Sequence, residues 1–145
     1  MSSVNASIII NHPIQQVFDY IISPQNGPKY IPYLKENSNI NPTEPVVGQT
    51  LNWRYAMSGL EMKGEAKVIE LVPPSKYVIA TNGNIASTWT FLLNEEEAGV
   101  KVNMTIDYEF DQNLLKMLID QLILDRFNQK AVEEVLENLK GLLET

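Results

Sequence analysis

The sequence contains no cysteine and a single histidine, His12, among its 145 residues. The absence of cysteine excludes disulfides, thiolate metal sites and cysteine nucleophiles. A lone histidine in a turn beside Pro13 does not make a zinc site or a catalytic triad, so we assign no metal, no cofactor and no catalytic residue. The glycines are spread singly, and no Gly-x-Gly-x-x-Gly or P-loop spacing for a phosphate occurs.

Basic residues are also few. Eleven Lys and Arg against 18 Asp and Glu give a formal net charge of −7, and the basic residues are scattered. Nucleic acids attract proteins through clustered Lys and Arg, so we expect no nucleic-acid partner and no anionic membrane partner. The sequence has neither an apolar run long enough for a membrane span nor a recognisable signal peptide. We therefore expect a cytoplasmic protein without a transmembrane segment.

What is present is the composition of an ordinary globular chain. Hydrophobic residues make up 44% and charged residues 20% of the sequence, which are typical values for a folded domain. The length is that of one domain. No repeat, linker or low-complexity tract divides the chain, so we predict a single domain over residues 1–145.

The first part of the chain predicts a strand followed by short helical segments. β-branched residues over 4–11 predict a strand. Pro13 suits the first position of a helix, and apolar residues at helical spacing over 14–22 predict an amphipathic helix. The stretch 24–32 holds three prolines and a glycine, which predicts a loop with one short helical turn.

From residue 38 the hydrophobic period changes to two, which indicates strands. The alternation is clearest over 51–57, 60–68, 77–81, 85–93 and 100–110. Asn82-Gly83-Asn84 predicts a hairpin with a type I′ turn, which needs positive φ at both central residues. A stretch without Gly or Pro up to Gly141 then predicts a helix over 112–143, about 45 Å long. Strands that run together with helices at the ends indicate an α+β fold with about six antiparallel strands.

The alternation places aromatic residues and methionines on one face of this sheet, and Arg54 on the other. One helix is only about 10 Å wide and cannot cover a curved sheet of this breadth. We therefore expect a cavity between sheet and helix, suited to an apolar ligand. The inward strand residues predicted to bind it are Trp53, Tyr55, Met62, Trp89, Phe91, Met104 and Tyr108.

The C-terminal helix would complete the site. Leu118 and Leu122 belong to an apolar stripe that Asp125 and Gln129 interrupt, and we include all four among the predicted ligand-binding residues. In one interpretation the two polar side chains meet a polar group of the ligand. In the other, which we favour, the helix is rotated, Asp125 lies at a solvated edge, and a second apolar track faces inward. That track is Leu124, Phe127, Ala131 and Val135.

Three segments resemble one known group of proteins. The opening segment, residues 8–21, has an apolar strand, a proline turn and a helix with Val17-Phe18. It resembles the start of START/Bet v 1-like (SRPBCC) proteins of the polyketide cyclase/dehydrase type. The proline-rich segment 24–32 and the hairpin from Trp89-Thr90-Phe91 to Val100-Lys101-Val102 are similar to that group as well. The resemblance implies a helix-grip fold, in which a curved six- to seven-stranded antiparallel sheet wraps around the C-terminal helix, with short helices after the first strand.

The same resemblance implies a ligand tunnel but no single activity. Our first hypothesis is a non-enzymatic protein that binds or carries a hydrophobic small molecule, such as a lipid, quinone, sterol or polyketide-like compound. One alternative is a polyketide cyclase or dehydratase. Another is a protein-interaction accessory module, with a homodimer or a protein partner held through the helix or through loop 24–34.

Overall fold

The computed structural model describes residues 2–57, 59–110 and 121–144, with the backbone alone for residues 2, 57, 110 and 121–127. The elements in chain order are β1 (Ser2–Ile10), α1 (Ile14–Ile22), the 3₁₀ turn η1 (Pro24–Asn26), α2 (Gly27–Tyr30), β2 (Leu34–Asn41), β3 (Thr50–Met57), β4 (Leu60–Val72), β5 (Lys76–Thr81), β6 (Ile85–Glu96), β7 (Gly99–Phe110) and α4 (Gln121–Leu143). In these residues no helix is both long and apolar enough to cross a bilayer.

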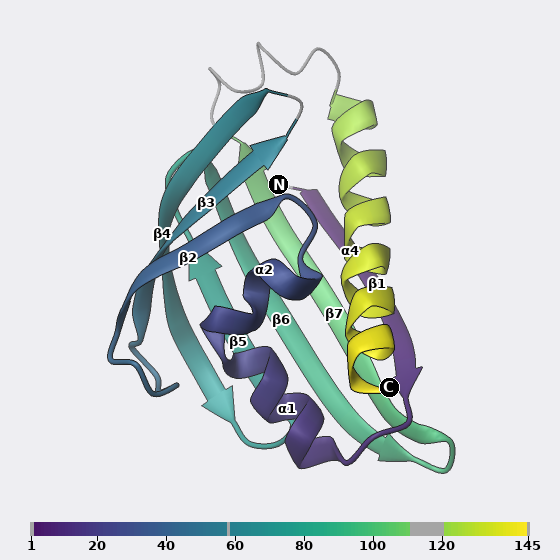
Figure 1. The fold of residues 1–145 in the computed structure, drawn as a ribbon. Helices are drawn as coiled ribbons and strands as arrows, with labels where there is room; N and C mark the ends of the chain where they lie inside the picture. Colours follow the sequence, from purple (N-terminus) through teal and green to yellow (C-terminus); the bar gives the residue numbers. More distant parts are fainter. Residues whose placement is uncertain (1, 58, 111–120, 145) are drawn as a thin grey trace.

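The seven strands form one antiparallel sheet in the order β1-β7-β6-β5-β4-β3-β2. Strands β2 to β7 are neighbours in sequence order, and β1 pairs with β7 at the other end of the sheet. The sheet curves, α1 and α2 lie across one end, and α4 runs beside β1 and β7 (Figure 1). The predicted α+β class, with a curved antiparallel sheet and a C-terminal helix, is confirmed.

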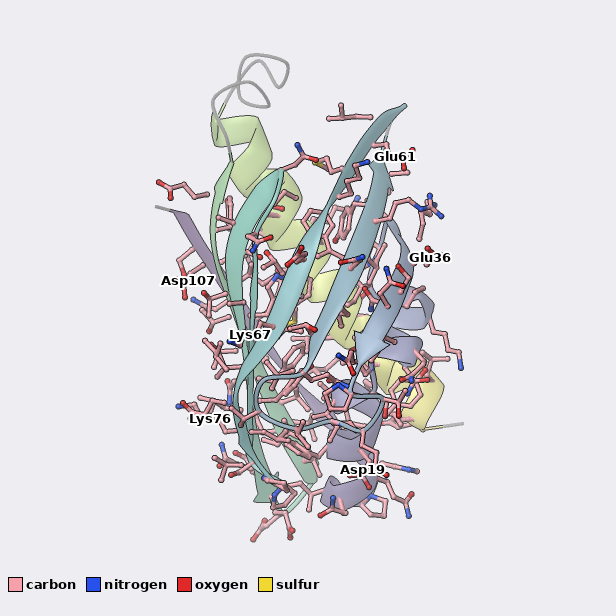
Figure 2. All side chains as sticks on the ribbon, turned by 90° about the vertical axis from the view of Figure 1, so that its left-hand side faces the viewer. Asp19, Glu36, Glu61, Lys67, Lys76 and Asp107 are labelled. Carbon is pink, nitrogen blue, oxygen red and sulfur yellow. The ribbon has the colours of Figure 1, made fainter. Side chains whose placement is uncertain are left out.

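The two faces of the sheet differ as the alternation predicts. Glu61, Lys67 and Asp107 project from the outer face (Figure 2). Arg54 lies on that face too, in a shallow groove with Lys63 and Glu65. Charged residues therefore coat the convex side, and apolar residues are left for the concave side.

The turn between β5 and β6 differs from the prediction. Gly83 has φ +105°, whereas Asn82 and Asn84 do not have positive φ, so the predicted type I′ geometry is wrong. The turn instead pairs with β4. The side-chain oxygens of Asn82 and Asn84 accept hydrogen bonds from the backbone N–H groups of Glu65 and Lys63 at 3.2 and 3.0 Å. These tertiary bonds decide the turn conformation.

Three strands extend three or more residues beyond the predicted ranges. β6 continues to Glu96 instead of residue 93. β2 begins at Leu34, before the alternation is evident. β4 continues to Val72 through an irregularity between Val68 and Glu70. A β-bulge adds a residue and re-aims the side chains that follow, so the period-two pattern stops at the bulge although the strand continues.

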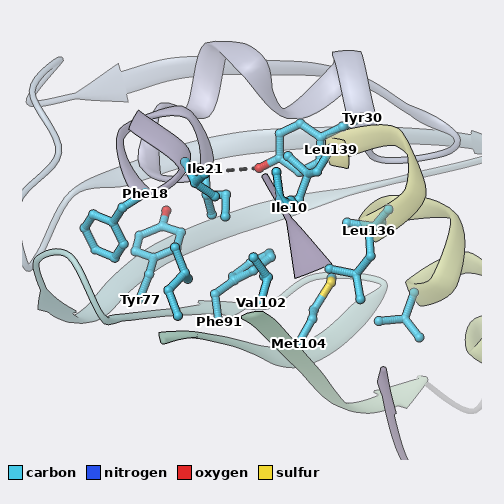
Figure 3. Close-up of a cluster of buried hydrophobic side chains, with 14 of the residues drawn as sticks. Ile10, Phe18, Ile21, Tyr30, Tyr77, Phe91, Val102, Met104, Leu136 and Leu139 are labelled. Carbon is cyan, nitrogen blue, oxygen red and sulfur yellow. Dashed lines mark hydrogen bonds between the residues drawn. The ribbon is translucent and has the colours of Figure 1, made fainter. Parts of the chain in front are cut away.

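Helix α4 packs along the edge strand β1 through both apolar and polar contacts. Val132, Val135, Leu136 and Leu139 are buried in the main core cluster. Figure 3 shows Leu136 and Leu139 within it. Lys140 Nζ donates to the carbonyl of Ile9 at 2.6 Å. These contacts cover an edge that would otherwise expose unpaired backbone groups, and they hold the helix on the β1 side of the sheet.

Candidate functional site: a cavity beneath the C-terminal helix

A cavity of about 140 Å³ lies between two separate clusters of buried side chains. The larger cluster joins α4, α1 and α2 mainly to β1, β6 and β7, with Val68 of β4 and Tyr77 of β5 as further members. The smaller one consists of Leu34, Leu51, Trp53, Met62 and Ala66. Because α4 sits on the β1 side, it does not reach across to the β2–β4 side, and the space remains between the two clusters.

The structure brings part of the predicted set to this cavity. Five predicted strand residues line it: Trp53, Tyr55, Trp89, Phe91 and Tyr108. Figure 3 shows Phe91 beside Tyr77, which lines the cavity as well; the centroids of the two rings are 6.1 Å apart. Contact of these residues with a ligand remains a prediction.

The other predicted ligand-binding residues either do not line the cavity or lie outside the residues that the structure describes. Met62 and Met104 are buried, with 2% and 0% of their surface exposed, but they pack inside the two clusters and are not among the cavity residues. Gln129 is turned to the sheet edge, where its Nε2 donates to the carbonyl of Asn5 at 3.0 Å. Leu118 and the side chains of Leu122 and Asp125 lie outside the described residues.

The described part of the second apolar track faces the cavity, while the side chains of Leu124 and Phe127 lie outside the described residues. Ala131 and Val135 line the cavity together with Asn128, while Gln129 faces β1. Val132, Leu136 and Leu139 of the first stripe are buried too, so both tracks contribute to the interior, and the side chain of Asp125, on which the two interpretations differ, lies outside the described residues. The amide of Asn128 is the member that the sequence pattern did not single out, since nothing in the spacing separates it from a solvated residue.

Sequence reasoning also left the α1–α2 segment out of the predicted set. Ile21, Pro24, Gly27, Tyr30 and Ile31 close one end of the cavity. The hydroxyl of Tyr30 donates to the carbonyl of Ile21 at 3.2 Å, and this bond ties α2 to α1 (Figure 3). The available signal was the apolar character of residues 30–34 within a proline-broken stretch.

Most polar groups around the cavity are held by protein partners. The indole Nε1 of Trp53 donates to the carbonyl of Glu65 at 3.1 Å. The indole Nε1 of Trp89 donates to Ser87 Oγ at 3.1 Å, and Ser87 is bonded in turn to the hydroxyl of Thr81. These bonds fix both indole rings in the cavity wall.

The titratable groups in the described wall are tyrosines. Burial raises the pKa of Tyr30, Tyr55 and Tyr77, and the neighbouring hydroxyls of Tyr77 and Tyr20 raise the pKa of Tyr30 further. Their hydroxyls are therefore neutral at physiological pH. Among the described lining residues there is no Lys, Arg, His, Asp or Glu, so this part of the wall is uncharged.

The sequence matches a known protein family over nearly its whole length. A profile of the family described as "Polyketide cyclase / dehydrase and lipid transport" matches residues 1–144. A search of curated proteins finds no match to the sequence.

Solved structures similar to this one come from several sources. The protein TTHA0849 from Thermus thermophilus has a TM-score of 0.82 and 16% identity, over 98% of this chain and 97% of that one. Ara h 8.0201 has a TM-score of 0.70 and 12% identity, over 98% and 97% of the two chains. The di-domain ARO/CYC StfQ from the steffimycin biosynthetic pathway has a TM-score of 0.77 and 13% identity, over 98% of this chain and 50% of that one. At these identities the similarity establishes the fold.

Proposed function

This chain belongs to the polyketide cyclase/dehydrase and lipid transport family, as its opening segment predicts, and we propose that it binds a small apolar molecule in the cavity beneath α4. The observation that carries this proposal is the cavity itself. It is lined mainly by apolar and aromatic side chains, which is the usual character of a small-molecule site.

The size of the cavity limits the ligand. Its volume is about 140 Å³, and an apolar cavity of about 150 Å³ holds a molecule the size of benzene. Pockets for larger ligands usually measure about 300–1,000 Å³. A single ring or a short chain therefore fits the cavity as it stands, whereas a sterol would require the sheet and helix to separate.

The chemistry of the described wall favours binding over catalysis. A general acid or base works best when its pKa lies near the working pH. The tyrosines of the wall have raised pKa values, which makes them poor proton donors at neutral pH. These properties support binding, rather than catalysis, as the proposed function.

Intrinsic fluorescence tests the proposal without a label. Trp53 and Trp89 are the only tryptophans in the sequence, and both line the cavity. Titration with ethylbenzene is expected to shift the emission saturably. Ala131 lines the cavity from α4, so Ala131→Phe is expected to fill the space and abolish the shift.

Ala86→Phe supplies the control, because Ala86 is exposed on β6. This variant is expected to bind like the wild type. The proposal fails if the wild type shows no saturable shift, or if Ala131→Phe responds as strongly as the wild type does.

A further inference from the structure

Some polar groups of the cavity wall have a hydrogen-bond partner in the protein, and others have none among the described residues. The indoles of Trp53 and Trp89 and the hydroxyl of Tyr30 all donate to protein acceptors. The hydroxyls of Tyr55 and Tyr77 have no hydrogen-bond partner among the described residues. The Nδ2 of Asn128 also has no partner in the described structure, and unlike the two hydroxyls this atom has almost no accessible surface.

An unpartnered buried amide is unfavourable, because the N–H groups lose their hydration and gain nothing in return. Asn128 lies on α4, and its side chain is part of the cavity wall. Its neighbour Gln129 shows the contrasting case, since that amide is satisfied by the carbonyl of Asn5. Among the described amides of α4, those of Gln129 and Asn138 donate to backbone carbonyls, whereas the Nδ2 of Asn128 is left without a partner.

The free amide indicates what the ligand must carry. A carboxamide can turn by half a revolution and exchange its donor and acceptor without changing shape. In either orientation its N–H groups need an acceptor. The described wall contains no cationic side chain that would compensate a ligand carboxylate, and an uncompensated charge in such a site is costly.

We propose that the cavity selects an uncharged ring compound bearing a carbonyl group, whose oxygen accepts a hydrogen bond from the Asn128 carboxamide. This inference rests on the proposed binding function and specifies the class of ligand. The ring occupies the space between Trp53, Trp89 and Phe91, and the carbonyl is directed to α4.

Two probes of similar size test the proposal, acetophenone and ethylbenzene, which differ by one carbonyl oxygen. Calorimetric titration gives the affinity of each. Because ethylbenzene is more hydrophobic, the informative quantity is the ratio of the two affinities and its change on mutation. Asn128→Leu is expected to lower the ratio of acetophenone to ethylbenzene affinity about tenfold, the effect of one lost hydrogen bond.

Gln129→Met is the matched control. It removes the neighbouring amide, and the affinity ratio is expected to stay at the wild-type value. Asn128→Leu is also expected to raise the Tm of the ligand-free protein, since it removes a buried donor without a partner. A fall in Tm would show that the amide serves the fold, and would overturn the inference.

The outcomes separate this inference from the function on which it rests. If the wild type binds neither probe, the binding function itself fails. If both probes bind and Asn128→Leu leaves their ratio unchanged, binding stands and the role of Asn128 is refuted. Benzoate that binds more tightly than acetophenone at pH 7 would refute the uncharged class.

A measurement on the wild type covers the case in which Asn128→Leu does not fold. The side-chain amide resonances of Asn128 in a nitrogen-15 NMR spectrum are expected to shift with acetophenone and to move much less with ethylbenzene. Equal shifts with both probes would overturn the inference.

Discussion

Gly64 of β4 allows close packing in the cavity wall because it has no side chain. A Cβ at this position would meet the carbonyl oxygen of Asn82 at 1.9 Å and Cζ2 of Trp53 at 2.7 Å. The first of these is backbone and cannot move aside cheaply. Glycine therefore allows the β5–β6 turn and the indole of Trp53 to approach β4 together.

We predict that Gly64→Ala lowers the free energy of unfolding by about 1–3 kcal/mol, the usual cost of overpacking, and shifts the emission of Trp53. Urea unfolding followed by tryptophan fluorescence measures both effects. Gly141→Ala is the control, because nothing lies within 4 Å of a Cβ there. This helical position is expected to gain about 0.5–1 kcal/mol. Equal effects of the two variants would contradict this account of Gly64.

The buried tyrosines predict a dependence of stability on high pH. Burial raises the pKa of Tyr77 in the folded protein, whereas an unfolded chain ionises its tyrosines near pH 10. Below about pH 10 the tyrosine is neutral in both states, and its ionisation does not affect stability. Above about pH 10 the unfolded chain loses the proton more readily than the folded protein, so the free energy of unfolding falls progressively. Each such tyrosine lowers the free energy of unfolding by up to about 1.4 kcal/mol per pH unit.

We therefore expect stability to fall steeply above about pH 10. Tyr77→Phe is expected to reduce that slope by the contribution of one proton, with little change at pH 8, since the structure records no hydrogen bond from this hydroxyl. Urea unfolding at a series of pH values measures the slope. An unchanged slope in Tyr77→Phe would show that this tyrosine titrates alike in both states.

Among the elements, α4 is fastened to the start of the chain at its C-terminal end. Glu144 Oε2 accepts hydrogen bonds from Lys140 Nζ and from the backbone N–H of Asn11, both at 2.7 Å. These bonds lower the pKa of the Glu144 carboxyl, with Lys140 as the largest cause. The fastening is therefore complete above the ordinary pKa of a glutamate and is lost as the pH falls through the lowered value.

We predict that Glu144→Ala speeds hydrogen exchange at the Asn11 amide, because it removes the acceptor. Glu137→Ala is the control: this residue is exposed on the same helix and is expected to leave Asn11 unchanged. Nitrogen-15 NMR of the exchanging amides measures the rates at pH 7. Identical rates at Asn11 in the two variants would show that the bond to Glu144 does not protect it.

Strand periodicity predicted much of the fold and part of the site, because the pleat alone decides which side a residue faces. It placed Trp53, Trp89 and Phe91 inward, and these residues line the cavity. It could not separate them from Met62 and Met104, which also face inward but are packed against neighbours. That distinction depends on where α4 lies over the sheet.

The helix was less predictable than the strands. Its placement on the sheet follows from contacts with a distant strand, such as the bond from Lys140 to Ile9, and no local pattern encodes them. The bulge after Val68 likewise interrupts the alternation on which the strand prediction depended. Asn128 lines the cavity because of where the helix lies, so its place in the cavity wall could not be predicted from the sequence.

At the scale of the whole molecule, the cavity results from an off-centre helix. α4 packs against β1, at one edge of the sheet, and the α1–α2 segment closes one end (Figure 1). The β2–β4 side keeps its own cluster around Trp53. A helix seated centrally over the sheet would merge the two clusters and eliminate the space.

The most direct test of this account locates a bound molecule. Intermolecular NOEs can be recorded on the protein with ethylbenzene. We predict contacts from the ligand to the indole protons of Trp53 and Trp89 and to the methyl groups of Val135. Contacts confined to Ile69 and Val72, which are exposed on β4, would place the molecule on the outer surface and contradict the account.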